Sequence, residues 1–325
     1  MKKKRNTVSM PTTEEGAVGG PGAKELVSQG AVLQMSGDLQ AAKAAYICAL
    51  DKDPRNVTAL NNLGFCHAQE GDYAQAMALY AQALAIDPSR SMALANMGGA
   101  QAALGQMDAA IRSFEKAVEM DQRNALAWEN LGKLYLAAGR CGDAEATWRS
   151  ALALFPVNAA LHTALGTVLA AQNRLDDAVA CFQKALSLDP DHTKAWVQLG
   201  IVLFMRRDLG SAAVAMKRAL ALAPEDTGAR HHLAMIAMAK GDAAEAAREL
   251  SRILILAPKH ARARLDLGVL ALSQRRYLKA FEDFQQVLEN DPGNEKAKYY
   301  RCLASELLGR RDQSPPPQFK KGEKP

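Results

Sequence analysis

The sequence has no apolar run near the roughly 18 residues that a helix needs to cross a bilayer. Its first residues, Met1 to Pro11, are basic but lack the apolar core of a cleaved signal peptide. The five cysteines are scattered without a close pair: Cys48, Cys66, Cys141, Cys181 and Cys302. An odd, unpatterned set argues against a disulfide framework or a zinc site and favours a reducing compartment. We therefore expect a cytoplasmic protein without a transmembrane segment.

Sequence signatures of catalysis are also missing. There is no phosphate-binding glycine loop, no nucleophile elbow and no HExxH pattern. The most site-like pair is His231–His232, but adjacent helical residues point in different directions and do not easily bind one metal. We predict that the protein is not an enzyme and needs no cofactor or metal.

The net charge of +5 does not come from the centre of the chain. Residues 1–22 carry four basic and two acidic side chains, which gives +2, and residues 310–325 carry five and two, which gives +3. The remainder is neutral overall, whereas nucleic-acid binding needs a basic stripe, so no nucleic-acid partner is expected. The two tails are rich in Gly, Pro, Ser, Thr and Lys and are predicted to be disordered. Contact of Lys2 to Arg5 with an anionic membrane surface is an alternative for the first tail.

Between the tails, residue types recur every 34 positions. Eight repeats without insertions are predicted: 23–56, 57–90, 91–124, 125–158, 159–192, 193–226, 227–260 and 261–294. Numbered from the start of each repeat, position 8 is small, position 20 is always alanine, position 24 is large, and position 32 is proline in seven of the eight repeats. Two amphipathic helices fit each repeat, with the small residues at positions 8 and 20 letting their backbones approach. Position 15 is glycine in five repeats, where a left-handed helix end suits glycine; Asn173 tolerates this conformation better than Arg207 or Arg275.

The fourth repeat resembles the tetratricopeptide repeat family most clearly. The matching residues are Trp128, Asn130, Leu131, Gly132, Tyr135, Gly139, Ala144, Ala151 and Pro156. The resemblance covers 23–294 and implies an all-α, right-handed superhelical solenoid of antiparallel helix pairs, with the first helix of each pair lining the inside. Residues 295–309 keep the helical pattern but place Lys298 and Arg301 at apolar positions, so we predict a polar capping helix there.

In this family, positions 2, 5, 6, 9, 12 and 13 tend to face the concave groove, and we call these positions the predicted peptide-binding surface. Position 6 holds Asn62, Asn96 and Asn130 in successive repeats, with Lys133 at position 9 nearby. An asparagine side chain both donates and accepts, so it can pair with the backbone of an extended peptide. This ladder resembles the asparagine-lined superhelices of O-linked N-acetylglucosamine transferases. The alternative is that these asparagines serve packing.

The second half of this surface is different in character. Its candidate residues are Gln198, Ile201, Phe204, Met205, His231, His232, Met235, Met238 and Asp266. The apolar members form either an adaptable trough for a partner or packing between repeats. Chaperone adaptors of this family hold a carboxylate terminus with lysine at position 5 and asparagine at position 9, and this sequence has neither.

These observations predict a scaffold that binds peptide segments of partner proteins in its groove. Two alternatives stay open. The array could be a targeting subunit of a separately encoded enzyme, such as a glycosyltransferase, or it could assemble with copies of itself as a homo-oligomer.

Overall fold

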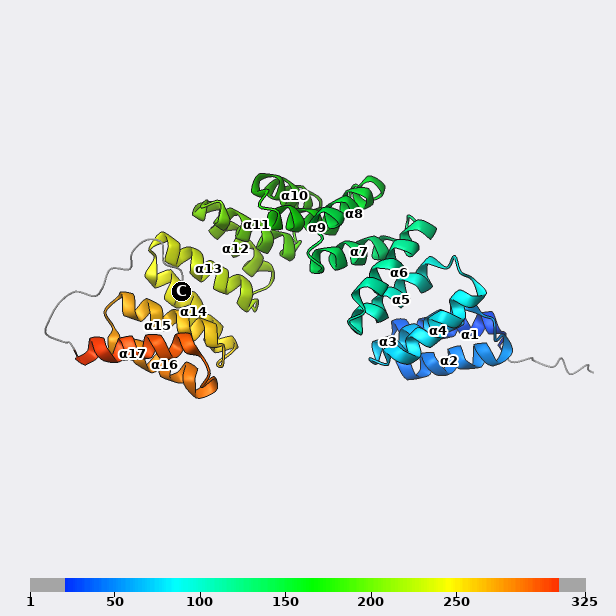
Figure 1. Ribbon diagram of the computed structural model, residues 1–325, viewed down its shortest axis with the longest axis horizontal. Coiled ribbons are helices and arrows are strands. Elements are labelled where there is room, and N and C mark those ends of the chain that lie inside the picture. The colour runs from blue at the N-terminus through cyan, green and yellow to red at the C-terminus, as the bar shows by residue number, and fades with distance from the viewer. Residues whose placement is uncertain (1–20, 310–325) are drawn as a thin grey trace, which may run out of the picture. The chain divides into compact units, whose positions relative to one another are not determined.

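The structure is a computed structural model that describes residues 21–309. These residues form 17 helices and contain no strand (Figure 1). Within these residues the chain divides into two compact units, one that ends at Gly139 and one that begins at Arg140. The tails predicted to be disordered lie outside the described residues, apart from Pro21 and Gly22, where Gly22 caps the first helix.

In the first unit, each helix packs on its neighbours in the chain. Its helices are α1 (Ala23–Met35), α2 (Leu39–Lys52), α3 (Val57–Gln69), α4 (Tyr73–Ile86), α5 (Ser91–Ala103), α6 (Met107–Met120) and α7 (Ala125–Ala137).

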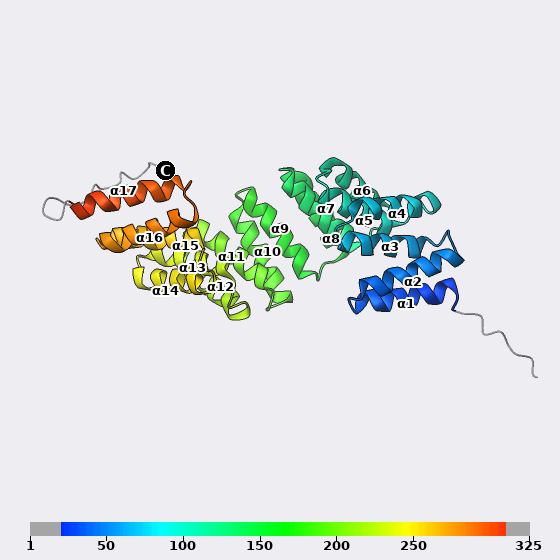
Figure 2. The same ribbon diagram turned by 90° about the horizontal axis from the view of Figure 1, so that it is seen from below.

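The second unit follows the same order of packing (Figure 2). Its helices are α8 (Cys141–Leu154), α9 (Ala159–Ala171), α10 (Leu175–Leu188), α11 (Thr193–Met205), α12 (Leu209–Leu222), α13 (Thr227–Lys240), α14 (Ala243–Leu256), α15 (Ala261–Ser273), α16 (Tyr277–Asn290) and α17 (Glu295–Gly309).

Many helix starts are capped by a side chain at a recurring position. At position 34, an Asn, Asp or His side chain accepts a backbone N–H of the next helix in six repeats, as in Asn56 with Ala59 and His260 with Ala263, whereas Arg90 and His192 make no such bond. At position 16, Asp38 and Asp242 do the same for the second helix. Each bond satisfies one of the unpaired N–H groups at a helix start, so these side chains fix where the helices begin.

The contact between positions 8 and 24 holds the two helices of a repeat together. A Cβ atom added to Gly64 would lie 2.7 Å from the Tyr80 ring, and one added to Gly268 would lie 2.5 Å from the Phe284 ring. The same contact is found at Gly30, Gly98, Gly166 and Gly200. Only glycine therefore lets the large residue at position 24 lie flat against the first helix.

The turn within each repeat adopts the left-handed conformation at position 15. The five glycines there have positive φ, and so do Asn173, Arg207 and Arg275, at 61°, 66° and 59°. The prediction from the glycine pattern is confirmed, and the two arginines adopt a conformation that is unfavourable for a residue with a Cβ atom.

A side chain at position 4 links five consecutive repeats to the one before. Trp128, His162, Trp196, Arg230 and Arg264 each bond through a ring or guanidinium nitrogen to the backbone carbonyl at position 32 of the preceding repeat. These bonds connect the start of one helix pair to the end of another, so they stabilise the stacking of repeats.

Helix α17 closes the second unit by packing on α16 and α15 (Figure 2). Its inner face buries Ala297 and Ala304, and Tyr300 stacks on Phe284 with ring centroids 5.5 Å apart. Its outer face exposes Lys298, Ser305 and other polar side chains. The predicted all-α solenoid with a C-terminal capping helix is thus confirmed.

Candidate functional site

The residues of the predicted peptide-binding surface lie on the first helices of the repeats. In the first unit they lie on α3, α5 and α7, and in the second unit on α11, α13 and α15. The residues of the first unit are mainly polar, and those of the second unit are mainly apolar.

The asparagines of the first unit are bonded within the protein. The Asn62 side chain donates to the Tyr46 hydroxyl at 3.4 Å, and the Asn96 side chain donates to Asn61 Oδ1 at 2.9 Å. Asn61 itself is buried and donates to Asn62 Oδ1. The prediction that these side chains pair with a peptide backbone is therefore wrong for Asn62 and Asn96, because their amide hydrogens bond to neighbouring helices, which is the packing alternative.

The end of the ladder is different. Asn130 is half-buried, and its side chain makes no hydrogen bond to any described residue. Lys133 pairs with Glu129 at 2.5 Å one helical turn away, with about half of its side chain exposed. Of the predicted site residues in the first unit, these two on α7 are the ones that a ligand can reach.

In the second unit, the apolar candidates are partly accessible. Met205 is 48% exposed, whereas Leu199 and Leu203 on the same helix are 6% and 8% exposed. Gln198, Ile201, Phe204, Met235 and Met238 are half-buried. Met238 also packs against the core around Ala237 and Leu270, so its role is divided between packing and surface.

The histidines have separate roles. His231 is buried, and its Nε2 lies 2.6 Å from Asp266 Oδ2, which links α13 to α15. Burial, together with the neighbouring His231 and Arg262, lowers the pKa of His232. His231 therefore serves packing between repeats and is not a surface contact, whereas His232 remains half-buried beside it.

A hollow on this surface includes one predicted residue, Asp266. Its volume is about 530 Å³, and it lies between α15 and the start of α17. The lining residues are Ala261, Arg262, Leu265, Asp266, Asn294 and Lys296. Arg262 and Lys296 are exposed and form no ion pair within residues 21–309, so the hollow offers two free cations beside an apolar wall.

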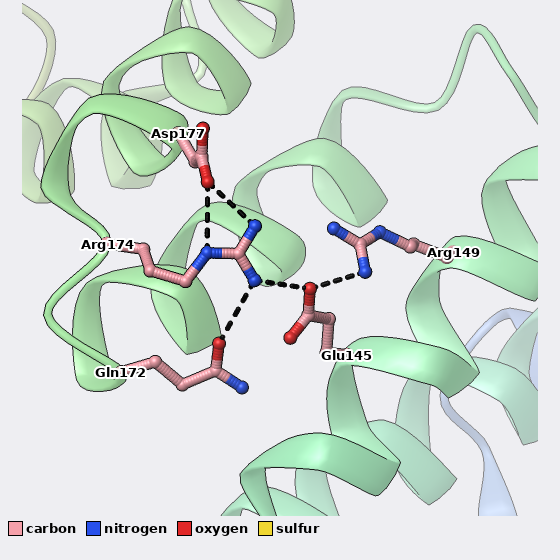
Figure 3. Close-up of polar contacts among 5 residues, drawn as sticks. All are labelled: Glu145, Arg149, Gln172, Arg174 and Asp177. Carbon is pink, nitrogen blue, oxygen red and sulfur yellow. Dashed lines mark hydrogen bonds and ion pairs between the residues drawn. The ribbon is translucent and has the colours of Figure 1, made fainter.

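A second polar cluster, not expected from the sequence, centres on Glu145 (Figure 3). Its carboxylate lies 2.7 Å from Arg174 Nη1 and also contacts Arg149, while Arg174 binds Asp177 at 2.7 Å. Burial acts to raise the pKa of Glu145, but hydrogen bonds from Gln172 and Arg174 and the charges of Arg149 and Arg174 outweigh it and lower the pKa. The cluster ties α8 to the turn before α10, which is a structural role.

Two fixed sequence separations could have revealed these bonds. Asn61 and Asn96 are 35 residues apart, as are His231 and Asp266, because position 5 of one repeat meets position 6 of the next. Arg230 and Glu249 are 19 residues apart, which joins positions 4 and 23 within a repeat. A search for complementary polar residues at these separations would have identified the bonds of Asn96, Asp266 and Arg230.

Other site types are not formed by the described residues. Between residues 21 and 309, no three His, Cys, Asp or Glu side chains come together as a metal site. The part of the chain that the structure describes holds no helix long and apolar enough to cross a membrane. All five cysteines are free thiols, and burial raises the pKa of Cys66 and Cys181.

Comparison with known families agrees with the repeat pattern. A family model described as "Cilia and flagella-associated protein 70 C-terminal domain", a tetratricopeptide-repeat domain, matches residues 1–235. The chain belongs to this family of tetratricopeptide-repeat proteins. A second tetratricopeptide-repeat model, "Cytochrome c-type biogenesis protein H TPR domain", matches residues 185–298. A comparison with curated protein sequences finds no match.

Solved structures share the fold of this tetratricopeptide-repeat chain. A chain of the APC/C hetero-tetramer Cut9–Hcn1 aligns with a TM-score of 0.60 and 17% identity, over 86% of this chain and 55% of that one. Pseudomonas aeruginosa PilF aligns with a TM-score of 0.55 and 22% identity, over 63% and 95%. A tetratricopeptide repeat protein from Parabacteroides merdae ATCC 43184 aligns with a TM-score of 0.51 and 19% identity, over 87% and 98%. The chain thus spans about half of the Cut9–Hcn1 chain it matches, and these likenesses concern the fold alone.

Proposed function

We propose that the protein is a non-catalytic scaffold that binds extended peptide segments of partner proteins along the first helices of its second unit. The observation that carries the proposal is the accessible apolar strip of Ile201, Phe204, Met205 and Met235. Residues used for packing alone would be buried as Leu199 and Leu203 are. A contiguous set of apolar side chains in contact with water is typical of a site that a partner covers, and these four share positions 9, 12 and 13 of two neighbouring first helices.

The chemistry of the strip indicates its selectivity. Methionine is flexible and polarisable, so it adapts to partners of different shape. The amides of Asn62 and Asn96 are already engaged, so general backbone pairing by an asparagine ladder is not part of the proposal. We therefore expect the strip to select apolar side chains, with Gln198 and His232 as the polar groups beside it.

The comparisons and the thiols support this assignment. One solved structure with the same fold is that of a hetero-tetramer of Cut9 and Hcn1, which is an assembly of proteins. The exposed free thiols of Cys48 and Cys302 fit a reducing compartment such as the cytoplasm.

The test is a peptide-selection experiment. Peptides selected from a random library on the full chain are measured by fluorescence anisotropy against a Phe204→Ser, Met205→Ser variant. The matched control is Val214→Ser with Leu222→Ser, since both of these residues are exposed on α12, the second helix of the same repeat. We expect the first variant to lose about tenfold or more in affinity, because two large apolar contacts are removed. Equal binding by both variants would contradict the proposed surface.

A further inference from the structure

A separate cleft lies on another face of the last repeats. Its volume is about 400 Å³, and it runs between α14 and α16 with α15 as its floor. The lining residues are Ala247, Ser251, Leu254, Ile255, Arg264, Leu267, Leu270, Ala271, Gln274, Arg276, Lys279 and Asp283. None of them occupies a position of the predicted peptide-binding surface, because positions 4, 7 and 11 of α15 lie on a different side from positions 2, 5 and 6.

The cleft is positively charged. Arg264, Arg276 and Lys279 line it against a single carboxylate, Asp283. Burial raises the pKa of Asp283, although Lys279 and Arg264 oppose the shift. Lys279 pairs with Asp283 at 3.2 Å and lies 3.9 Å from Glu282, which does not line the cleft, and Arg276 bonds to the neutral Gln274 side chain. Cationic groups therefore outnumber the acids that could neutralise them.

In the preceding repeat, the arginine and the acid at the corresponding positions form a close, buried ion pair. There Arg230 and Glu249 occupy the same two positions, pair at 2.6 Å, and are 10% and 9% exposed. In the last repeat Asp283 is one methylene shorter, so it lies 3.7 Å from Arg264, whose side chain is 20% exposed. The shorter acid leaves this arginine weakly paired and within reach of a ligand.

The rim of the cleft is apolar. Ile255 is 78% exposed, and Leu254 and Leu267 are half-buried beside it. No aromatic side chain lines the cleft, so there is no platform on which a nucleic-acid base could stack. A narrow cleft with cations on one side and aliphatic groups on the other fits a chain that carries acids and apolar residues, whereas a flat lipid surface does not enter it.

We propose that this cleft binds an acidic peptide segment of a partner protein, with a carboxylate at Arg276 and Lys279 and an aliphatic side chain against Ile255 and Leu254. The basis is charge complementarity together with the exposed Ile255. The site is independent of the strip around Phe204 and gives the scaffold a second point of attachment.

The test uses a short fluorescein-labelled peptide of alternating glutamate and leucine, whose side chains lie on opposite sides when it is extended. Anisotropy is measured on the full chain and on an Arg276→Glu, Lys279→Glu variant. The charge-matched control is Lys184→Glu with Arg218→Glu, two exposed residues of α10 and α12 that form no ion pair within the described residues. We expect the cleft variant to lose about tenfold or more in affinity and the control to bind like the parent.

Ile255→Ser provides a variant that is safe for folding, because this side chain is already in water. Ile255→Ser should also lower the affinity for the peptide, whereas Phe204→Ser should leave that affinity unchanged. This difference separates the cleft from the site of the proposed function. The same peptide with glutamine in place of glutamate should bind more weakly. The inference is overturned if the peptide does not bind at about 1 mM, or if the control loses as much as the cleft variant. It is also overturned if only anionic vesicles or a single-stranded oligonucleotide bind.

Discussion

The same link between neighbouring repeats is made by neutral groups in the first unit and by ionisable groups in the second. Asn96 donates to Asn61 at 2.9 Å, and Asp266 lies 2.6 Å from His231. Both pairs join position 6 of one repeat to position 5 of the repeat before. The repeat therefore specifies where a link is made and leaves its chemistry open.

The pair at positions 4 and 23 follows the same rule. In the second repeat these positions hold Leu60 and Leu79, which belong to one apolar cluster. In the seventh they hold Arg230 and Glu249, a buried ion pair. Positions 8 and 24 stay uncharged in both repeats, as Gly64 with Tyr80 and as Ala234 with Leu250. Sensitivity of stability to pH and charge should therefore be concentrated in the second unit.

The largest expected effect comes from breaking the buried ion pair. Glu249→Ala leaves Arg230 without its carboxylate in a site where the arginine is 10% exposed. Removing one partner of a buried pair costs about 3–5 kcal/mol, which urea unfolding would measure. Arg230→Trp combined with Glu249→Ala recreates the residues of the sixth repeat, Trp196 and Ala215, and should recover most of the loss. If the double variant stays as unstable as the single one, an unpaired charge is not the cause.

The next largest loss of stability, caused by a large side chain at position 8, should be equal in the two units. Gly98→Leu and Gly268→Leu each place a side chain against a position-24 ring that a Cβ would meet at 2.8 Å and 2.5 Å. Overpacking of this kind costs about 1–3 kcal/mol, seen as a lower melting temperature. Gly99→Leu is the control, because a Cβ there meets nothing within 4 Å. A marked difference between Gly98 and Gly268 would show that packing, too, differs between the units.

The links between position 5 of one repeat and position 6 of the next should contribute different amounts of stability in the two units. Asn96→Ala removes a neutral hydrogen bond and should cost about 0.5–1.5 kcal/mol, whereas Asp266→Ala removes a bond to a charged group and should cost about 1.5–3 kcal/mol. Chemical denaturation of both variants gives the comparison. Equal losses would mean that the carboxylate adds nothing to the second link.

The smallest expected effect is on the pH dependence of stability, which should have opposite signs for Glu145 and Asp283. The folded pKa of Glu145 is below its ordinary 4.5, so the stability it contributes is present above that pH and is lost as the pH falls through the folded value. The folded pKa of Asp283 is above 3.8, so its ionisation costs stability as the pH rises through the raised value. The melting temperature of the parent minus that of Glu145→Gln should fall on acidification, and the same difference for Asp283→Asn should rise. Slopes of the same sign would contradict the two assignments.

The fold was predictable because its determinants are periodic. Glycine at position 8 and a large residue at position 24 recur with the helix pairs they hold together, and position 15 marks each left-handed turn even where it is Arg207 or Arg275. Each of these features depends on local backbone geometry and on a neighbour at a fixed separation, so one sequence is enough to reveal them.

The surface was less predictable, because facing a groove does not determine what a side chain touches. Asn62 lies on the expected helix face, but a hydroxyl from Tyr46 is within its reach. The cleft at Arg264 depends on Asp283 being one methylene too short to close it, a difference that no periodic pattern records. Such features follow from side-chain length and neighbour identity together.

The bond from position 4 to a backbone carbonyl has a consequence for the history of the gene. Its acceptor is a main-chain oxygen that any residue supplies, as Gln122 does in place of proline, and its donor is indole, imidazole or guanidinium. A recombination that deletes or duplicates one 34-residue period between Trp128 and Arg264 still places a donor beside an acceptor at the new junction. The array can therefore change its number of repeats in a single genetic event and still form this bond at the new junction.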